Sequence, residues 1–123
     1  MDRKIKIMLC DLTHTGMGLN ADHFPLGIGF LASYALTTFN NEVEISLHKL
    51  PEELLDELGK DIPDVLGFSA YNWNVKLSYK IASYAKELNP KVNIIFGGPD
   101  FPISKNSREI FLNQRPAIDF FIK

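Results

Sequence analysis

The chain has 123 residues, of which 46% are hydrophobic and 23% charged, as expected for one globular domain with a substantial core. Its net charge of −2 and its scattered lysines and arginines exclude a basic face for nucleic acid or an anionic membrane. No apolar run could cross a bilayer, the first residues do not resemble a secretory signal, and the single cysteine, Cys10, excludes a disulfide framework, so we expect a cytoplasmic protein.

The first half of the chain alternates strand-like and helix-like patterns. An apolar stretch from Lys4 to Leu12 predicts a central strand. Apolar residues at three- and four-residue spacing predict a helix from Leu26 to Phe39, with its core side at Ile28, Leu31, Ala32, Ala35, Leu36 and Phe39. Val43 to Leu47 is typical of a second strand. Pro51 and the two glutamates after it predict the start of a short helix.

The second half continues the alternation. A helix that ends before Asn89 is indicated by an apolar stripe at Leu77, Ile81, Ala85 and Leu88. Asn106 and Glu109 form a plausible capping pair for a last helix, which continues through Asn113. Three more strands are expected at Val65–Ser69, Val92–Phe96 and Ile118–Ile122.

This alternation of strands and helices predicts an α/β protein with a parallel sheet covered on both faces. Five strands in this order favour the flavodoxin-like (Rossmann-like) three-layer fold, with strand order 2-1-3-4-5. Ligands of such sheets bind beyond the carboxyl ends of the strands. We therefore expect residues 11–25, 69–74 and 97–102 to lie along one ligand-binding edge.

The chain stops at Lys123, at the end of the fifth expected strand, so the helix that usually covers this strand is missing. We expect residues 1–123 to be one domain and an N-terminal piece of a longer chain. An uncovered apolar strand face favours association. A weak dimer of the fragment is therefore a further expectation.

The stretch VNIIFGGPDFP, residues 92–102, ends an apolar strand with two glycines. Glycine is costly in ordered structure and is usually kept for a positive φ or for close approach to the backbone. Gly97 and Gly98 could form only a tight turn. On a ligand-binding edge they could also form a flat backbone surface for a broad or deeply inserted group.

The loop DLTHTGMGLNADHFP, which follows the first strand, is much longer than such connections usually are. Its His14 and His23 could bind a metal, although a loop histidine is more often solvated or hydrogen-bonded. The segment around Gly16 and Gly18 is similar to the phosphate loop of flavodoxins. A phosphate loop needs a helix N-terminus at the anion, and the helix here begins several residues too late.

In the loop GFSAYNWN, Ser69 ends the third strand and two aromatic residues follow. Ser69 could cap a helix while Tyr71 and Trp73 close the edge of the core. Alternatively, the hydroxyl group and the aromatic side chains could line a site for a planar ligand. A response-regulator receiver would need an aspartate at position 69 to accept phosphate, which argues against a phosphorelay.

Four segments together resemble one family. PLGIGFLASYA, DVLGFSAYNWN, IIFGGPDFP and AIDFFIK, in this order, are similar to the N-terminal cobalamin-binding domain of cobalamin-dependent radical S-adenosylmethionine enzymes. The similarity covers essentially the whole chain. It implies a flavodoxin-like domain that holds cobalamin at its carboxyl edge and presents it to a following domain with an iron–sulfur cluster.

The motifs of this family match unevenly. Ser69 matches the serine of the family's Ser-x-Leu motif, but Tyr71 stands where leucine is expected. Gly97-Gly98 matches the Gly-Gly motif. The Asp-x-His-x-x-Gly motif, whose histidine binds cobalt, is not matched. Its absence suits the radical branch of the family, which commonly lacks this histidine, and leaves His14 or His23 as a weak candidate for a cobalt ligand.

The resemblance implies cobalamin as cofactor and the protein's own C-terminal catalytic domain as partner, with S-adenosylmethionine and the iron–sulfur cluster in that missing part. The expected cobalamin-binding residues are Asp11, Leu12, Thr13, His14, Ser69, Ala70, Tyr71, Trp73, Gly97, Gly98 and Pro99. We expect no catalytic residue, and no turnover by this chain alone, because the cofactor carries the difficult chemistry. Two alternatives are a flavodoxin-like electron-transfer protein with a flavin and an interaction domain without ligand.

Overall fold

A computed structural model of the chain describes residues 3–13 and 26–122. The strands are β1 (Ile5–Cys10), β2 (Val43–His48), β3 (Val65–Ser69), β4 (Asn93–Gly97) and β5 (Phe120–Ile122). The helices are α1 (Leu26–Phe39), α2 (Pro51–Lys60), α3 (Val75–Leu88) and α4 (Lys105–Asn113), with a short 3-10 turn at Asn40–Glu42. Each strand and helix expected from the sequence is present, with small shifts at several ends.

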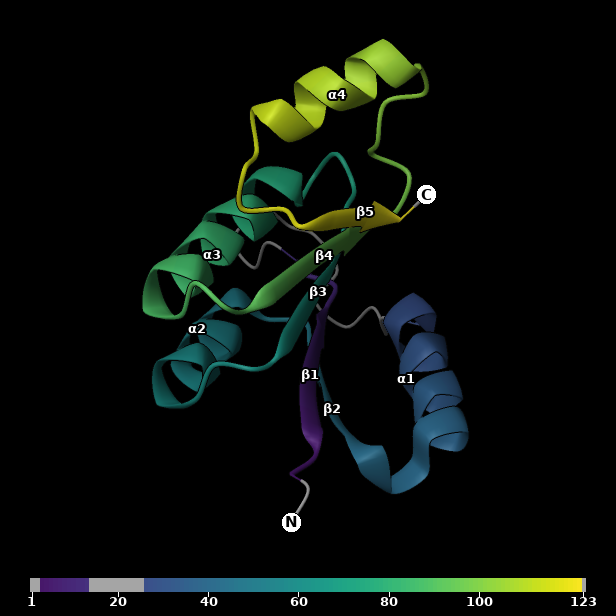
Figure 1. Cartoon of the computed structure of the whole chain (residues 1–123), viewed down its shortest axis with the longest axis vertical. Helices are drawn as coiled ribbons and strands as arrows, with labels where there is room; N and C mark the ends of the chain where they lie inside the picture. The colour runs from purple at the N-terminus through teal and green to yellow at the C-terminus, as the bar shows by residue number, and fades with distance from the viewer. Residues whose placement is uncertain (1–2, 14–25, 123) are drawn as a thin grey trace.

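The five strands form one sheet in the order β2-β1-β3-β4-β5, and every neighbouring pair is parallel. This confirms the predicted flavodoxin-like fold. Figure 1 shows α2 and α3 on one face of the sheet, α1 on the other, and α4 beyond β5. In the register of the sheet, Ser69 at the end of β3 lies beside Gly97 at the end of β4, and Gly97 lies beside Ile122 of β5.

The core lies between the sheet and the helices α2 and α3. Alternate strand residues point to this side, because successive side chains of a strand face opposite ways. The strand residues of this core are Met8, Cys10, Leu66, Phe68, Ile94 and Phe96, each at most 3% exposed. The helices contribute Leu54, Leu58, Ile81, Ala82 and Ala85. On the opposite face, Leu9 and Ile95 are only half-buried.

Helix α1 buries less than its sequence pattern predicted. Ile28 and Ala32 are buried, but Leu31, Leu36 and Phe39 are 60%, 46% and 48% exposed. The reason is that α1 packs mainly along the edge strand β2, so only a narrow stripe of the helix meets the sheet. Helix α1 has no charged residue, yet no helix within residues 3–13 and 26–122 is long and apolar enough to span a membrane.

The ends of α4 and β5 also differ from expectation. Ser104, and not Asn106, caps α4: its hydroxyl accepts a hydrogen bond from the Ser107 N–H at 3.2 Å. The fifth strand begins at Phe120, two residues later than predicted, because the Ile118 N–H is used in a turn to the Arg115 carbonyl.

Candidate functional site

The loops that follow β1, β3 and β4 lie at the carboxyl edge of the sheet, since parallel strands all end on the same side. The described part of the first loop is Asp11 to Thr13. Residues 14–25, with His14 and His23, lie outside the described residues. The predicted contribution of these two histidines therefore stays a prediction.

The second and third loops are joined by backbone hydrogen bonds. The Ala70 N–H donates to the Gly97 carbonyl at 2.6 Å, and the Asp100 N–H donates to the Ala70 carbonyl at 3.3 Å. Ala70 itself is fully buried. Ala70 therefore holds the two loops together through its backbone, and its buried methyl group is not available to a ligand.

The two glycines meet different surroundings. Gly98 has a φ of +127°, and a β-carbon there would lie 2.6 Å from the Ala70 carbonyl oxygen. The fold alone therefore requires glycine at this position. Gly97 has no such φ, and its β-carbon would lie 3.4 Å from the Ile122 carbonyl oxygen. Gly97 thus remains the glycine at which a ligand could approach the backbone.

Asn74 connects the first loop to the second and was not singled out from the sequence. Its fully buried side chain donates to the Leu12 carbonyl at 3.1 Å and accepts from the Tyr71 N–H at 2.9 Å. Asn74, and not Ser69, is the residue that precedes α3, and its side chain does not cap the helix. The sequence signal was an asparagine directly before a helical pattern, a position where its amide can bond to backbone groups on both sides.

Ser69 is the polar side chain best placed at this edge. Phe68 points into the core, so Ser69, the next residue, faces the α1 side of the sheet and is half-buried. Among the described residues its hydroxyl has no hydrogen-bond partner, while Gly97 beside it presents bare backbone. A free hydroxyl next to a position without a side chain suits the insertion of a polar group against the sheet.

Aromatic side chains border the same edge. The rings of Tyr71 and Trp73 are stacked, with centroids 4.5 Å apart and planes 4° from parallel. Trp73 is 53% exposed, so this pair offers apolar surface to a ligand at the carboxyl edge of the sheet. Pro99 is exposed, whereas the Leu12 side chain is fully buried and can contribute only backbone groups.

The chemistry near the first loop excludes a thiol ligand. Cys10 is fully buried, and burial together with the charge of Asp11 raises the pKa of its thiol far above the ordinary value. Within residues 3–13 and 26–122 there is no cluster of three metal-ligating side chains. The described part of the edge offers a ligand hydrogen-bonding groups and apolar surface.

Comparison with protein families decides the identity of the domain. The family model for the B12 binding domain matches residues 18–122, nearly the whole chain. This chain belongs to the B12-binding domain family. It is a cobalamin-binding domain by descent, and the resemblance noted in the sequence is confirmed.

Two curated relatives match this B12-binding domain over a small part of their own length. The cobalamin-dependent radical SAM methyltransferase TokK of Streptomyces tokunonensis is 31% identical over 110 residues, which are 84% of this chain and 15% of that protein. The 2-(S-pantetheinyl)-carbapenam-3-carboxylate methyltransferase of Streptantibioticus cattleyicolor is 32% identical over 112 residues, 86% of this chain and 16% of that protein.

Solved structures share the fold of this B12-binding domain. A CheY-like receiver domain protein of Methanospirillum hungatei has a TM-score of 0.61 at 14% identity and covers 98% of this chain and 81% of its own. A cobalamin-binding protein of Desulfitobacterium hafniense has a TM-score of 0.60 at 19% identity, over 97% of this chain and 53% of its own. At these identities the likeness concerns the fold alone.

Proposed function

We propose that this domain holds cobalamin at its carboxyl edge, with the nucleotide tail of the cofactor inserted against the sheet beside Ser69 and Gly97. The observation that carries the proposal is the half-buried Ser69 hydroxyl, which lacks a partner among the described residues and lies next to the bare backbone of Gly97, in a chain of the B12-binding family. These residues fit the group, since a polar tail needs both a hydrogen-bond partner and room against the sheet.

Each residue has a separate role in this proposal. Ser69 donates or accepts a hydrogen bond to the tail, and Gly97 leaves the adjacent strand end without a side chain. Tyr71 and Trp73 shield the edge of the corrin ring. Asp11 and Thr13 border it from the first loop. Cobalamin, when bound, supplies the methyl-transfer or radical chemistry, and the protein supplies binding and orientation.

We further propose that the domain serves a longer radical S-adenosylmethionine methyltransferase. The support is that the matched relatives are cobalamin-dependent or carry methyltransferase names, and that the match covers only 15% and 16% of their lengths. S-adenosylmethionine and the iron–sulfur cluster would then belong to a catalytic domain outside these 123 residues. The 123-residue chain alone, supplied with cobalamin and S-adenosylmethionine, would show no turnover.

The binding proposal is tested by titrating the protein with hydroxocobalamin and following the visible spectrum of the bound cofactor. Ser69→Ala and Gly97→Ala should weaken binding well beyond any loss of stability. Ser83→Ala, in the middle of α3, and Gly59→Ala, where an added β-carbon meets nothing within 4 Å, are matched controls. Unchanged affinity in both edge variants, or binding of flavin mononucleotide in place of cobalamin, contradicts the proposal.

A further inference from the structure

A separate pocket of about 400 Å³ lies between the edge strand β2 and helix α2. It is lined by Lys6, Met8, Glu44, Ile45, Ser46, Leu47, His48, Glu53, Asp56 and Glu57. Ser69 and Gly97, by contrast, end β3 and β4, and each follows a residue whose side chain points into the core on the α2 side, Phe68 and Phe96, so they face the other side of the sheet. The pocket is therefore distinct from the proposed cobalamin edge.

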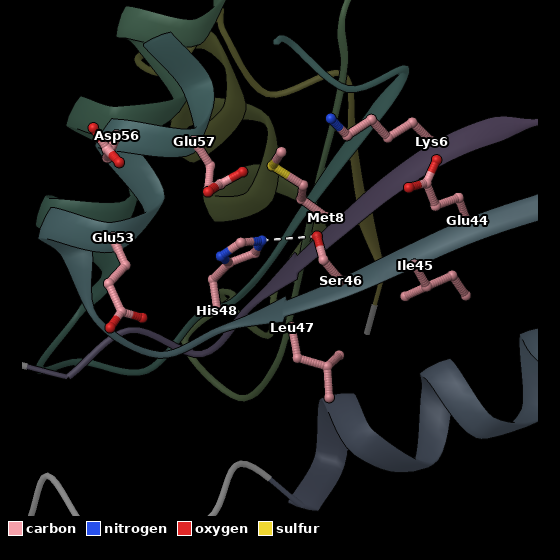
Figure 2. A pocket seen from close by; sticks show the side chains of 10 residues that line it. All are labelled: Lys6, Met8, Glu44, Ile45, Ser46, Leu47, His48, Glu53, Asp56 and Glu57. Atoms are coloured by element: carbon pink, nitrogen blue, oxygen red, sulfur yellow. Dashed lines mark hydrogen bonds between the residues drawn. The ribbon is translucent and has the colours of Figure 1, made fainter. Parts of the chain in front are cut away.

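His48 is the chemical centre of this pocket. Its side chain is nine-tenths buried, and its Nε2 lies 2.8 Å from the Ser46 hydroxyl oxygen. The other ring nitrogen, Nδ1, has no hydrogen-bond partner among the described residues and still reaches the open space of the pocket. Figure 2 shows the ring between β2 and the acidic side chains of α2. Because Nδ1 is accessible from the pocket and no described residue bonds to it, a group that enters the pocket can do so.

Burial also favours the neutral form of this ring. Desolvation lowers the pKa of His48 below the ordinary value, and the charge of Lys6 lowers it further. The carboxylates of Glu57 and Glu53 act in the opposite direction, but their effect is smaller than that of burial. A neutral imidazole whose one nitrogen donates a hydrogen bond to the Ser46 hydroxyl group can accept a hydrogen bond at the other nitrogen. The Ser46 contact thus leaves Nδ1 as an acceptor when Nε2 carries the proton.

The charges around the pocket favour a cation. Lys60 pairs with Asp56 at 3.3 Å and Glu57 at 3.8 Å, and Lys6 pairs with Asp61 at 2.9 Å. Glu44 and Glu53 have no ion pair within the described part of the chain. An anion would be repelled by these two carboxylates.

The geometry also selects among cations. No three metal-ligating side chains of the described residues come close enough to hold a metal ion. A group with N–H donors can instead bond to the His48 nitrogen and reach a carboxylate across the pocket. Its carbon chain would lie against Met8, whose side chain is almost fully buried at the base of the pocket.

We propose that the pocket between β2 and α2 binds a protonated primary amine, either a free amine or a lysine side chain. One N–H of the ammonium group donates to Nδ1 of His48, and the Glu53 carboxylate balances its charge. Glu44 and Glu57 add to the negative potential of the pocket, and Lys6 limits it. This site is independent of cobalamin.

The experiment is a titration of the protein with n-butylamine, protonated at neutral pH, followed by the ring resonances of His48 in NMR spectra. Saturable shifts at Nδ1 are expected with n-butylamine. Tetramethylammonium, a cation without N–H groups, should not reproduce them. Nα-acetyl-lysine methylamide forms the second arm: saturation by both amines assigns the site to lysine side chains as well, and saturation by n-butylamine alone assigns it to free amines.

Two variants of one helix make the test specific. Glu53→Gln should weaken amine binding about two- to fivefold, as expected for one exposed ion pair. Glu52→Gln removes the same charge from the neighbouring position, which does not line the pocket, and should leave binding unchanged. The proposal is overturned if neither amine saturates, if tetramethylammonium gives the same Nδ1 shifts, or if both glutamine variants weaken binding equally.

Discussion

A methyl group added at Gly98 would lie 2.6 Å from the carbonyl oxygen of Ala70, on a backbone whose φ is +127°. At Gly97, one residue earlier, the same methyl group would make only a tight contact with Ile122. The sequence left two roles open for the pair, a tight turn or a flat backbone surface for a ligand. The structure separates the two glycines. Gly98 is already required by the contact between two loops of the protein, whereas Gly97 is not.

Gly98→Ala should lower the free energy of unfolding by about 2 kcal/mol or more, because an L-residue is strained at this φ and the Ala70 loop has to move. Urea denaturation measures the effect. Gly59→Ala, in the open part of α2, should leave stability equal or slightly higher. Equal stability of Gly98→Ala and the wild type would show that the loops do not touch as described.

Cys10 gives a second prediction for a single residue. Its thiol is fully buried and its pKa is raised, so little thiolate is present or accessible at neutral pH. We expect no reaction with a disulfide reagent such as Ellman's reagent in the native protein and one equivalent of reaction in urea. Rapid modification without denaturant would refute the burial of this residue.

At the scale of secondary-structure elements, Asp64 fixes the start of the sheet. Its carboxylate accepts from the Lys6 N–H at 2.8 Å and from both terminal nitrogens of Arg3, at 2.8 and 2.6 Å. Its backbone N–H donates to the Lys6 carbonyl, and its carbonyl accepts from the Asn93 N–H. One residue thus connects the beginnings of β1, β3 and β4.

Asp64→Ala should lower the free energy of unfolding by about 1 kcal/mol, mostly through loss of the Lys6 bond, since the exposed Arg3 pair is screened by solvent. Hydrogen bonds to Arg3 and Lys6 lower the Asp64 pKa from 3.8 to about 2. The contribution of Asp64 is therefore complete above pH 3.8 and is lost as the pH falls toward 2.

Denaturation at several pH values checks this prediction. The wild type should lose more stability than Asp64→Ala between pH 4 and pH 2, a window set by the two pKa values of about 2 and 3.8. Asp61→Ala, which removes only an exposed ion pair with Lys6, should change stability little. Parallel pH profiles for the wild type and Asp64→Ala would contradict the assigned role.

At the scale of the whole molecule, the strand order and the meeting of three loops at the carboxyl edge of the sheet could be predicted, because they depend on hydrophobic periodicity and on how parallel strands must be connected. The long-range contacts of Asn74 could not, because a buried amide can bond to any backbone group that the fold brings near. The exposure of Leu31 could not be predicted either, because α1 has no charged residue that would mark its solvent-facing side. The ligand contacts of Ser69 and Gly97 stay a prediction.

The exposed apolar surface supports one prediction about assembly. Phe30 and Tyr34 on α1, and Phe120 and Ile122 on β5, are each more than half exposed. Exposed apolar surface of this kind favours association. We therefore expect weak self-association of the 123-residue chain in sedimentation experiments at increasing concentration. Tyr34→Glu with Ile122→Glu should reduce it, whereas Ser33→Glu, on the same helix, should reduce it less. A strictly monomeric wild type would contradict this expectation.

The strand order also has a kinetic consequence. Neighbouring strands of the sheet are parallel and have at least one helix between them in the chain, so none of these pairs is a hairpin. Each pair of strands can form only when the ends of that longer connection come together. The central pairing of β1 with β3 places Ile7 beside Val65, so its formation closes a long loop of chain that contains α1, β2 and α2. Closing such long loops has an entropic cost before any contact offsets it, which slows the search for the native state. Refolding from urea should therefore take milliseconds to seconds, slower than a helical bundle of the same length.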